Sequence, residues 1–208
     1  MTQTTAATSA ASPPECLQRG TTLLEVLVVM AGMLVVSALA VPAVGARTDE
    51  LATGGAARYL ATLLQRERSN AIRRATHMAF WFQTTPGAGI RYAVFADGNG
   101  NGVRASDISR GIDIQVTAWE FLSDHFAGVA ISIAPGVSDI DSGSPIGGAP
   151  VRLGGSELLS FSPTGTATSG TVYLSGRTRQ QYAVRVLGST GRVRLLRFNA
   201  TANQWSAP

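Results

Sequence analysis

The sequence predicts an α+β protein in which one long N-terminal helix precedes a β-rich body. Changes in the spacing of apolar residues along the chain indicate this fold class. Residues 26–46 carry no charge, and apolar positions in residues 60–75 repeat at the period of an α-helix. From His77 onward apolar and polar residues alternate, and the chain has 23 glycines to supply turns. A chain of 208 residues can hold one globular domain and an anchoring helix.

The uncharged block Val26–Ala46 has 21 residues and ends at Arg47. An α-helix needs about 20 apolar residues to cross the hydrocarbon core of a bilayer. The block is longer than the apolar region of a secretory signal, and a small-residue cleavage site would fall beyond it. We therefore expect residues 21–46 to form a single transmembrane helix.

One carboxylate, that of Glu25, lies at the start of this block. A carboxylate in hydrocarbon is costly unless it has a partner. Cleavage after Gly20 would supply one, because the new amino group of Thr21 is cationic and can meet Glu25 of a neighbouring subunit in a helical assembly. The alternative is a plain membrane anchor that keeps residues 1–20, and that alternative leaves Glu25 unexplained.

The run from Gly20 to Glu25, GTTLLE, resembles the class III prepilin signal of type IV pilins and type II secretion pseudopilins. The resemblance implies that a prepilin peptidase removes the leader 1–20 after Gly20 and methylates Thr21, where Phe or Met is usual. It implies that Glu25 is needed for assembly. It also implies that Pro42 occupies the position of a proline that kinks the membrane helix.

This resemblance also carries expectations about location and partners. It implies a single-pass protein of the bacterial inner membrane whose head lies in the periplasm until the subunit enters a filament. Its partners would be other pilin or pseudopilin subunits, the prepilin peptidase and the inner-membrane assembly platform.

Residues 47–76 are expected to continue the helix into the head, after a weak point at Gly54-Gly55. The apolar positions are Leu60, Leu63, Leu64, Ala71, Ile72 and Ala75, and the polar ones are Arg66, Glu67, Arg68, Arg73 and Arg74. We expect the apolar stripe to pack on a sheet. The polar side would face solvent, or alternatively lipid headgroups or a neighbouring subunit.

Residues 77–208 are expected to form the β-rich head. The predicted strands are Met78–Gln83, Ile90–Phe95, Ile112–Glu120, Val129–Ile133, Leu158–Phe161, Thr171–Leu174, Tyr182–Leu187 and Arg192–Phe198. The long polar stretch Ala134–Pro150 is expected to be a mobile surface loop.

Two segments of the head resemble the GspH/FimT family of type II secretion minor pseudopilins and type IV minor pilins. One is Phe161–Thr166 followed by Gly170–Leu174, and the other is Tyr182–Val186 followed by Gly191–Arg194. The resemblance implies a pilin-like fold, a long helix packed on an antiparallel β-sandwich-like head. It implies a minor pseudopilin or pilin subunit near the tip of a type II secretion pseudopilus or a type IV pilus.

Arginines gather in the last part of the chain, where residues 147–208 hold seven of them and one acid, Glu157. Arg192 and Arg194 would point to the same face of one strand, and Arg185 of the preceding strand can join them. The FimT branch is similar in carrying a Gly-Arg-x-Arg element that binds DNA during natural transformation. DNA is therefore an alternative partner. The other interpretation is that these arginines only keep an exposed strand soluble.

The run from Asp97 to Gly102, DGNGNG, places oxygens at alternating positions as calcium loops do. Asp97, Asn99 and Asn101 are thus weak metal candidates. The twelfth position is Ile108, where a calcium loop needs a glutamate, and Asn-Gly pairs are strong turn formers. A plain turn is the favoured interpretation.

The remaining composition argues against catalysis. The only cysteine, Cys16, lies in the predicted leader, so the mature chain would lack a thiol. The only histidines, His77 and His125, have no plausible nucleophile beside them in the sequence. We expect neither a cofactor nor an enzymatic activity.

Overall fold

The computed structural model describes residues 22–208, apart from the side chains of residues 39–44. Gly20, Thr21 and the leader lie outside the described residues, so cleavage and methylation there stay predictions. Pro42 falls within a helix, but its side chain is also outside the description. The chain divides into two compact units, Met1–Pro42 and Ala43–Pro208.

A single helix, α1 (Leu23–Arg74), covers the segments that the sequence divides into a membrane part and an amphipathic part. The helix continues through Gly54-Gly55, the predicted weak point. No described helix has both the length and the hydropathy of a membrane span.

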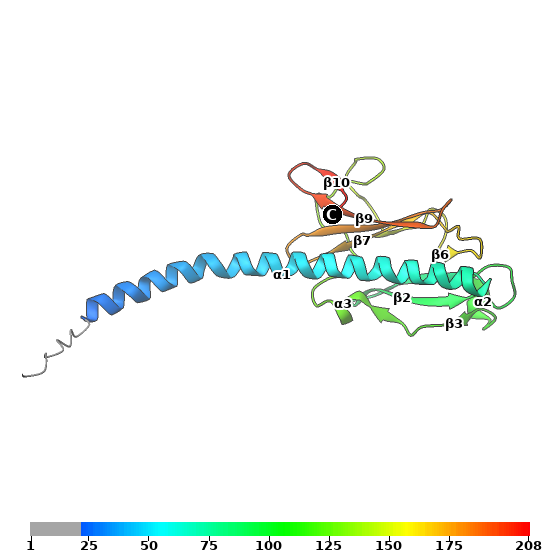
Figure 1. The fold of residues 1–208 in the computed structure, drawn as a ribbon, viewed down its shortest axis with the longest axis horizontal. Helices are drawn as coiled ribbons and strands as arrows, with labels where there is room; N and C mark the ends of the chain where they lie inside the picture. Colours follow the sequence, from blue (N-terminus) through cyan, green and yellow to red (C-terminus); the bar gives the residue numbers. More distant parts are fainter. Residues whose placement is uncertain (1–21) are drawn as a thin grey trace, which may run out of the picture. The chain divides into compact units, whose positions relative to one another are not determined.

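The head contains two antiparallel sheets, drawn in Figure 1. Sheet 1 has the order β3-β2-β1-β6, with β4 also paired to β2. Its strands are β1 (Met78–Thr85), β2 (Gly89–Ala96), β3 (Ile114–Gln115), β4 (Glu120–Phe121) and β6 (Leu158–Phe161). Sheet 2 has the order β10-β9-β8-β7-β5. Its strands are β5 (Val151–Arg152), β7 (Gly170–Ser175), β8 (Gln181–Leu187), β9 (Arg192–Asn199) and β10 (Gln204–Ser206). The short helix α2 (Ala105–Ser109) lies between β2 and β3 of sheet 1, and the short helix α3 (Leu122–His125) lies between β4 of sheet 1 and β5 of sheet 2. The predicted α+β class is confirmed.

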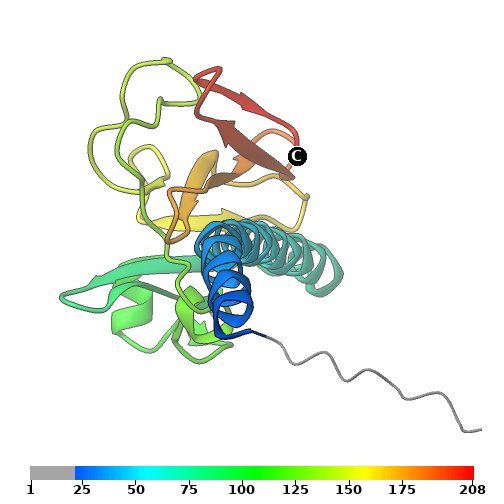
Figure 2. The same cartoon turned by 90° about the vertical axis from the view of Figure 1, so that its left-hand side faces the viewer.

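Within the head, α1 packs against both sheets, and Figure 2 shows the two sheets on different sides of it. The buried helix positions are Asp49, Thr53, Gly54, Ala56, Ala57, Leu60, Leu64, Glu67 and Ala71. Gly54 and Gly55 allow the close approach: a Cβ atom would lie 3.2 Å from the Tyr182 hydroxyl at Gly54 and 3.3 Å from Phe126 at Gly55. The glycine pair is therefore a packing feature of the helix.

Three positions differ from the predicted stripe: Glu67 is buried, whereas Ile72 is exposed and Ala75 is exposed beyond the end of α1. Glu67 is 2% exposed and lies on the buried side, because the spacing from Leu64 to Ala71 turns residue 67 inward. Its carboxylate accepts hydrogen bonds from Arg66 Nε and Asn70 Nδ2, both at 2.9 Å. Ile72, predicted to be in the stripe, is 45% exposed.

Six of the eight predicted strands are present with bounds within two residues, and two are wrong. The segment predicted as Ile112–Glu120 splits into β3 and β4. Val116 and Thr117 both donate to the Val94 carbonyl, while Val94 N–H donates to Thr117 Oγ1, which interrupts the regular ladder. The segment predicted as Val129–Ile133 forms no strand; it makes an isolated bridge from Ala130 to Ser175, and the Ser132 N–H donates to the Tyr173 carbonyl.

The stretch Ala134–Pro150, predicted as a mobile surface loop, packs in part on the outer face of sheet 2 through Ala134, Val137 and Ile146, whereas residues 141–145 and 147–149 are exposed; we call it the packed layer. Val137 is buried with Phe198 of β9, and Trp205 of β10 packs against this cluster. The Trp205 indole N–H donates to the Ser138 carbonyl at 2.7 Å. The polar sequence hid this packing because its few apolar residues, such as Val137, are far apart.

Candidate functional site

The N-terminal unit exposes apolar side chains over its described length. Leu23 is 83% exposed, Leu27 61%, Met33 65% and Val36 66%. A helix that is apolar on all sides is normally covered by lipid or by other helices. This unit therefore has an uncovered apolar surface within the single chain.

Glu25 lies in the first turn of α1, where the partial positive charge of the helix N-terminus stabilises a carboxylate. Its backbone N–H donates to Thr22 Oγ1 at 3.3 Å. Thr22 and Glu25 thus have the Thr-x-x-Glu spacing of a helix-capping pair. The GTTLLE run therefore has a second role, helix capping, which the Thr-x-x-Glu spacing indicates.

The arginines of the β8–β9 hairpin meet on the outer face of sheet 2, as predicted. Arg185 of β8 lies directly opposite Arg194 of β9, and Arg192 is two residues away on the same face. Arg192 and Arg194 are exposed. Among residues 22–208, no carboxylate lies within 4 Å of either guanidinium group.

The rest of this surface is less basic than the sequence predicts. Arg185 pairs with Asp141 at 2.7 Å, and Arg152 forms an ion pair with Asp139. These acids come from the packed layer, which brings part of the acidic segment onto the arginine-rich sheet. The 290 Å³ cavity between the two pairs is therefore lined by both signs of charge.

The other arginines do not extend the hairpin group. Arg177 and Arg179 lie in the β7–β8 turn, at the opposite end of β8 from Arg192. Arg197 pairs with Glu50 of α1 at 2.7 Å. The structure therefore separates the arginines into two groups, one at each end of sheet 2.

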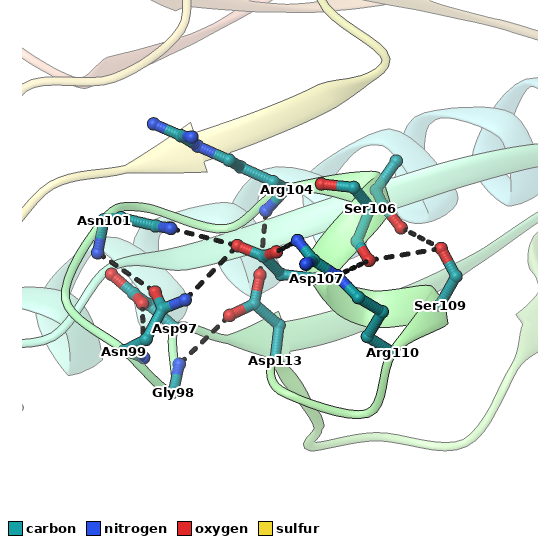
Figure 3. A network of polar contacts seen from close by, with 11 residues as sticks. Asp97, Gly98, Asn99, Asn101, Arg104, Ser106, Asp107, Ser109, Arg110 and Asp113 are labelled. Carbon is teal, nitrogen blue, oxygen red and sulfur yellow. Dashed lines mark hydrogen bonds and ion pairs between the residues drawn. The ribbon is translucent and has the colours of Figure 1, made fainter.

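The DGNGNG loop folds around its own acids, as Figure 3 shows. The Asp97 carboxylate accepts hydrogen bonds from three backbone N–H groups, those of Asn99, Gly100 and Gly102. The Asp107 carboxylate accepts from the side-chain amides of Asn99 and Asn101. The loop is thus a closed hydrogen-bond network.

These bonds also set the charge of the acids. Burial alone would raise the pKa of Asp97, but the three N–H donors outweigh it and the pKa is lowered. The Asn101 amide, with Asn99 and Arg110, lowers the pKa of Asp107 despite some burial. Both are ionised at neutral pH.

A third acid, Asp113, accepts from the N–H groups of Gly98 and Arg104. The side-chain amides of Asn99 and Asn101 both point their nitrogens at Asp107. Within the described part of the chain, no group of three or more His, Cys, Asp or Glu residues is placed to hold a metal ion. The arrangement supports the turn interpretation.

Two turns of the head meet at α1 in a way that the sequence analysis did not foresee. Arg68 Nε donates to the Gly165 carbonyl in the turn after β6 at 3.1 Å. Gly191, with φ +59°, lies against the same carbonyl, and a Cβ atom there would be 2.6 Å from Arg68 Nε. The glycines of both resemblance segments are therefore needed for close packing.

The family model for type II transport protein GspH matches residues 56–191. The match ends before Arg192 and Arg194 and begins after the GTTLLE run. No curated protein matches the chain.

Among solved structures, the chain is similar to the minor pseudopilin EpsH from the Type 2 Secretion System of Vibrio cholerae. The two share 13% sequence identity, and the alignment covers 70% of this chain and 96% of that one with a TM-score of 0.42. The family assignment rests on the family model, which matches well over half of the chain. This protein belongs to the GspH family of type II transport proteins.

Proposed function

We propose that this protein is a minor pseudopilin, a structural subunit that enters a type II secretion pseudopilus through α1. The observation that carries the proposal is the uncovered apolar surface of the helix, with Glu25 as the only acid among residues 22–46. Membership of the GspH family supports it.

The physical argument concerns what covers that surface. Fully burying one Leu or Val side chain contributes about 1.5–3 kcal/mol. A helix with Leu23, Leu27 and Val36 more than half exposed is therefore strongly driven into lipid or against other helices. We propose the inner membrane as its environment before assembly and neighbouring subunit helices afterward.

Glu25 would favour packing against neighbouring subunit helices over the lipid environment. After cleavage behind Gly20, the Thr21 amine of one subunit would pair with the Glu25 carboxylate of the next. Pairing removes the cost of a lone carboxylate in an apolar setting, so insertion into a filament becomes favourable at one register. The head would then lie near the filament tip, against other minor subunits.

The test is a Glu25→Ala variant expressed beside the other pseudopilins, with Glu25→Asp as the charge-preserving control. We expect both variants to remain in the membrane fraction after alkaline wash, and only Glu25→Ala to be lost from sheared filaments. Mass spectrometry of the N-terminus would report cleavage after Gly20 and methylation of Thr21. Normal incorporation of Glu25→Ala would overturn the docking role.

A second candidate function has one observation in its favour. Arg192 and Arg194 are exposed on one face without a carboxylate nearby, and paired guanidinium groups suit phosphate oxygens. Such a surface would bind DNA without sequence preference, and binding would weaken steeply with salt. Fluorescence anisotropy with the full chain in detergent, at two salt concentrations, tests it. Salt-sensitive binding lost in an Arg192→Ala/Arg194→Ala variant would support DNA capture, and no binding at low salt would exclude it.

A further inference from the structure

The other arginine group lies at the end of the head where α1 enters it. The turn 176–180 joins β7 to β8, and the turn 200–203 joins β9 to β10. Because Tyr182 lies opposite Arg197 in the ladder, both turns are at the same end of sheet 2. Figure 1 shows the turn before β10 at this end.

Asp49 fixes this end to the helix. Its carboxylate accepts hydrogen bonds from the backbone N–H of Arg177 at 2.9 Å and of Thr178 at 2.7 Å. The Thr178 hydroxyl donates a third bond to it. Asp49 follows Ala46 by three residues, which is about 4.5 Å of helix rise. The turn that carries Arg177 and Arg179 is therefore held beside the end of the uncharged block.

The charge at this end is mainly positive. Arg177 and Arg179 are exposed, and the Arg47 side chain is 82% exposed. Of the nearby acids, Asp49 is occupied by the turn, and Glu50 pairs with Arg197 at 2.7 Å and with Arg47 at 3.5 Å. No ion pair within 4 Å involves Arg177 or Arg179 in the described part of the chain.

The shape of this end also suits a small anionic group. A hollow of about 520 Å³ lies between the two turns, lined by Arg179, Arg197, Thr178, Asn199 and Thr201 among others. Arg179 holds φ +61°, a conformation that is strained for a residue with a Cβ atom. Glycine or asparagine would relieve that strain, so the turn itself does not require an arginine at this position.

We propose that this end of the head binds the phosphate headgroups of anionic phospholipids while the subunit waits in the inner membrane. The inference rests on the proposed membrane position of α1. Guanidinium groups pair with phosphate oxygens through two donors, and basic residues at a membrane surface are attracted to anionic lipid. The contact would hold the head against the bilayer until the subunit is extracted into the filament.

The experiment uses the full chain in lipid nanodiscs, with Cys16→Ser and one reporter cysteine. A spin label at Thr201→Cys lies beside the hollow, and one at Ser189→Cys lies at the far end of sheet 2. The depth of each spin label in the bilayer is measured in phosphatidylcholine discs with and without phosphatidylglycerol. We expect the Thr201 label to lie at headgroup depth only with phosphatidylglycerol, and the Ser189 label to remain in water throughout.

Variants separate charge from folding. Arg177→Gln/Arg179→Gln should lower the ratio of headgroup-bound to unbound heads by about fivefold for each arginine. High salt should lower the same ratio in the wild-type protein. Arg177→Lys/Arg179→Lys should restore much of it. The matched control Arg192→Gln/Arg194→Gln removes the same charge at the far end of sheet 2 and should leave the depth of the Thr201 label unchanged. Arg179→Gln alone serves if the Arg177 change disturbs folding.

The possible results separate the headgroup contact from the membrane position of α1, on which it depends. Protein that stays in the discs through an alkaline wash, but whose Thr201 label does not respond to phosphatidylglycerol, overturns the headgroup contact alone. An equal response in the Arg177→Gln/Arg179→Gln variant overturns it too. Protein that leaves the discs on washing overturns the membrane position of α1 and this inference with it.

Discussion

Replacing Asp49 should detach the β7–β8 turn from α1 and lower the stability of the head. Asp49 is 8% exposed, and its carboxylate accepts three hydrogen bonds from Arg177 and Thr178. A hydrogen bond to a charged group contributes about 1.5–3 kcal/mol net. Water can replace part of this at an exposed turn, so we expect Asp49→Ala to lower the free energy of unfolding by about 2–4 kcal/mol.

The effect should depend on pH with a defined sign. Burial alone would raise the pKa of Asp49, but the hydrogen bonds from Thr178 and Arg177 outweigh it, and the pKa is lowered. A folded-state pKa below the unfolded value of about 3.9 contributes stability above that value. The contribution is lost as the pH falls through the folded-state pKa. The gap between wild type and Asp49→Asn should therefore be constant near neutral pH and close in acid.

The assay is urea unfolding of the full chain in detergent, followed by the fluorescence of Trp81, Trp119 and Trp205, which all lie in the head. Asp141→Asn is the matched control, because that carboxylate is 68% exposed and makes one ion pair. It should cost less than about 1 kcal/mol. An Asp49→Ala protein within about 0.5 kcal/mol of wild type would refute the reasoning.

Three further results follow from the packing of the head. Gly191→Ala should lower the free energy of unfolding in urea by about 2 kcal/mol or more, because the new Cβ atom would clash with its neighbours and because the residue has a positive φ. Gly87 also has a positive φ, +78°, but lies in open space, so Gly87→Ala should lower the free energy of unfolding by about 1 kcal/mol. Trp205→Phe removes the N–H donor to the Ser138 carbonyl, so we expect faster proteolysis within residues 134–150. An unchanged proteolysis rate would mean that this hydrogen bond does not hold the packed layer on sheet 2. Calcium or EDTA should leave the thermal midpoint unchanged, because the oxygens of Asp97 already accept three N–H groups; a calcium-dependent rise would restore the metal interpretation.

Local patterns were enough to predict most of the strands. β1, β2 and β6 to β9 lie in segments rich in β-branched, aromatic and other apolar residues that turn residues separate, so local patterns predicted them to within two residues. Ile112–Glu120 shows the same pattern but splits, because Thr117 Oγ1 takes the place of a backbone acceptor for Val94. A side chain that competes with the ladder is not visible in apolar periodicity.

The surroundings of the charged side chains were predicted less well than the positions of the apolar ones. Glu67 is charged yet buried, with partners on its own helix at Arg66 and Asn70. The run of arginines in residues 147–208 suggested one basic surface, but Asp141 and Glu50 arrive from distant parts of the chain to pair with Arg185 and Arg197. Such pairings join residues tens of positions apart, and no local window contains them.

The sequence by itself determined the α+β class, the long helix, the position of Glu25 and the family resemblance, because each depends on spacing within a few residues. The tertiary structure alone decided that Ala134, Val137 and Ile146 pack against sheet 2, that Gly165 and Gly191 meet at Arg68, and that Asp49 holds the β7–β8 turn. These contacts form only when the chain brings distant segments together, since their free energy comes from shared burial and hydrogen bonds rather than from local conformational preference.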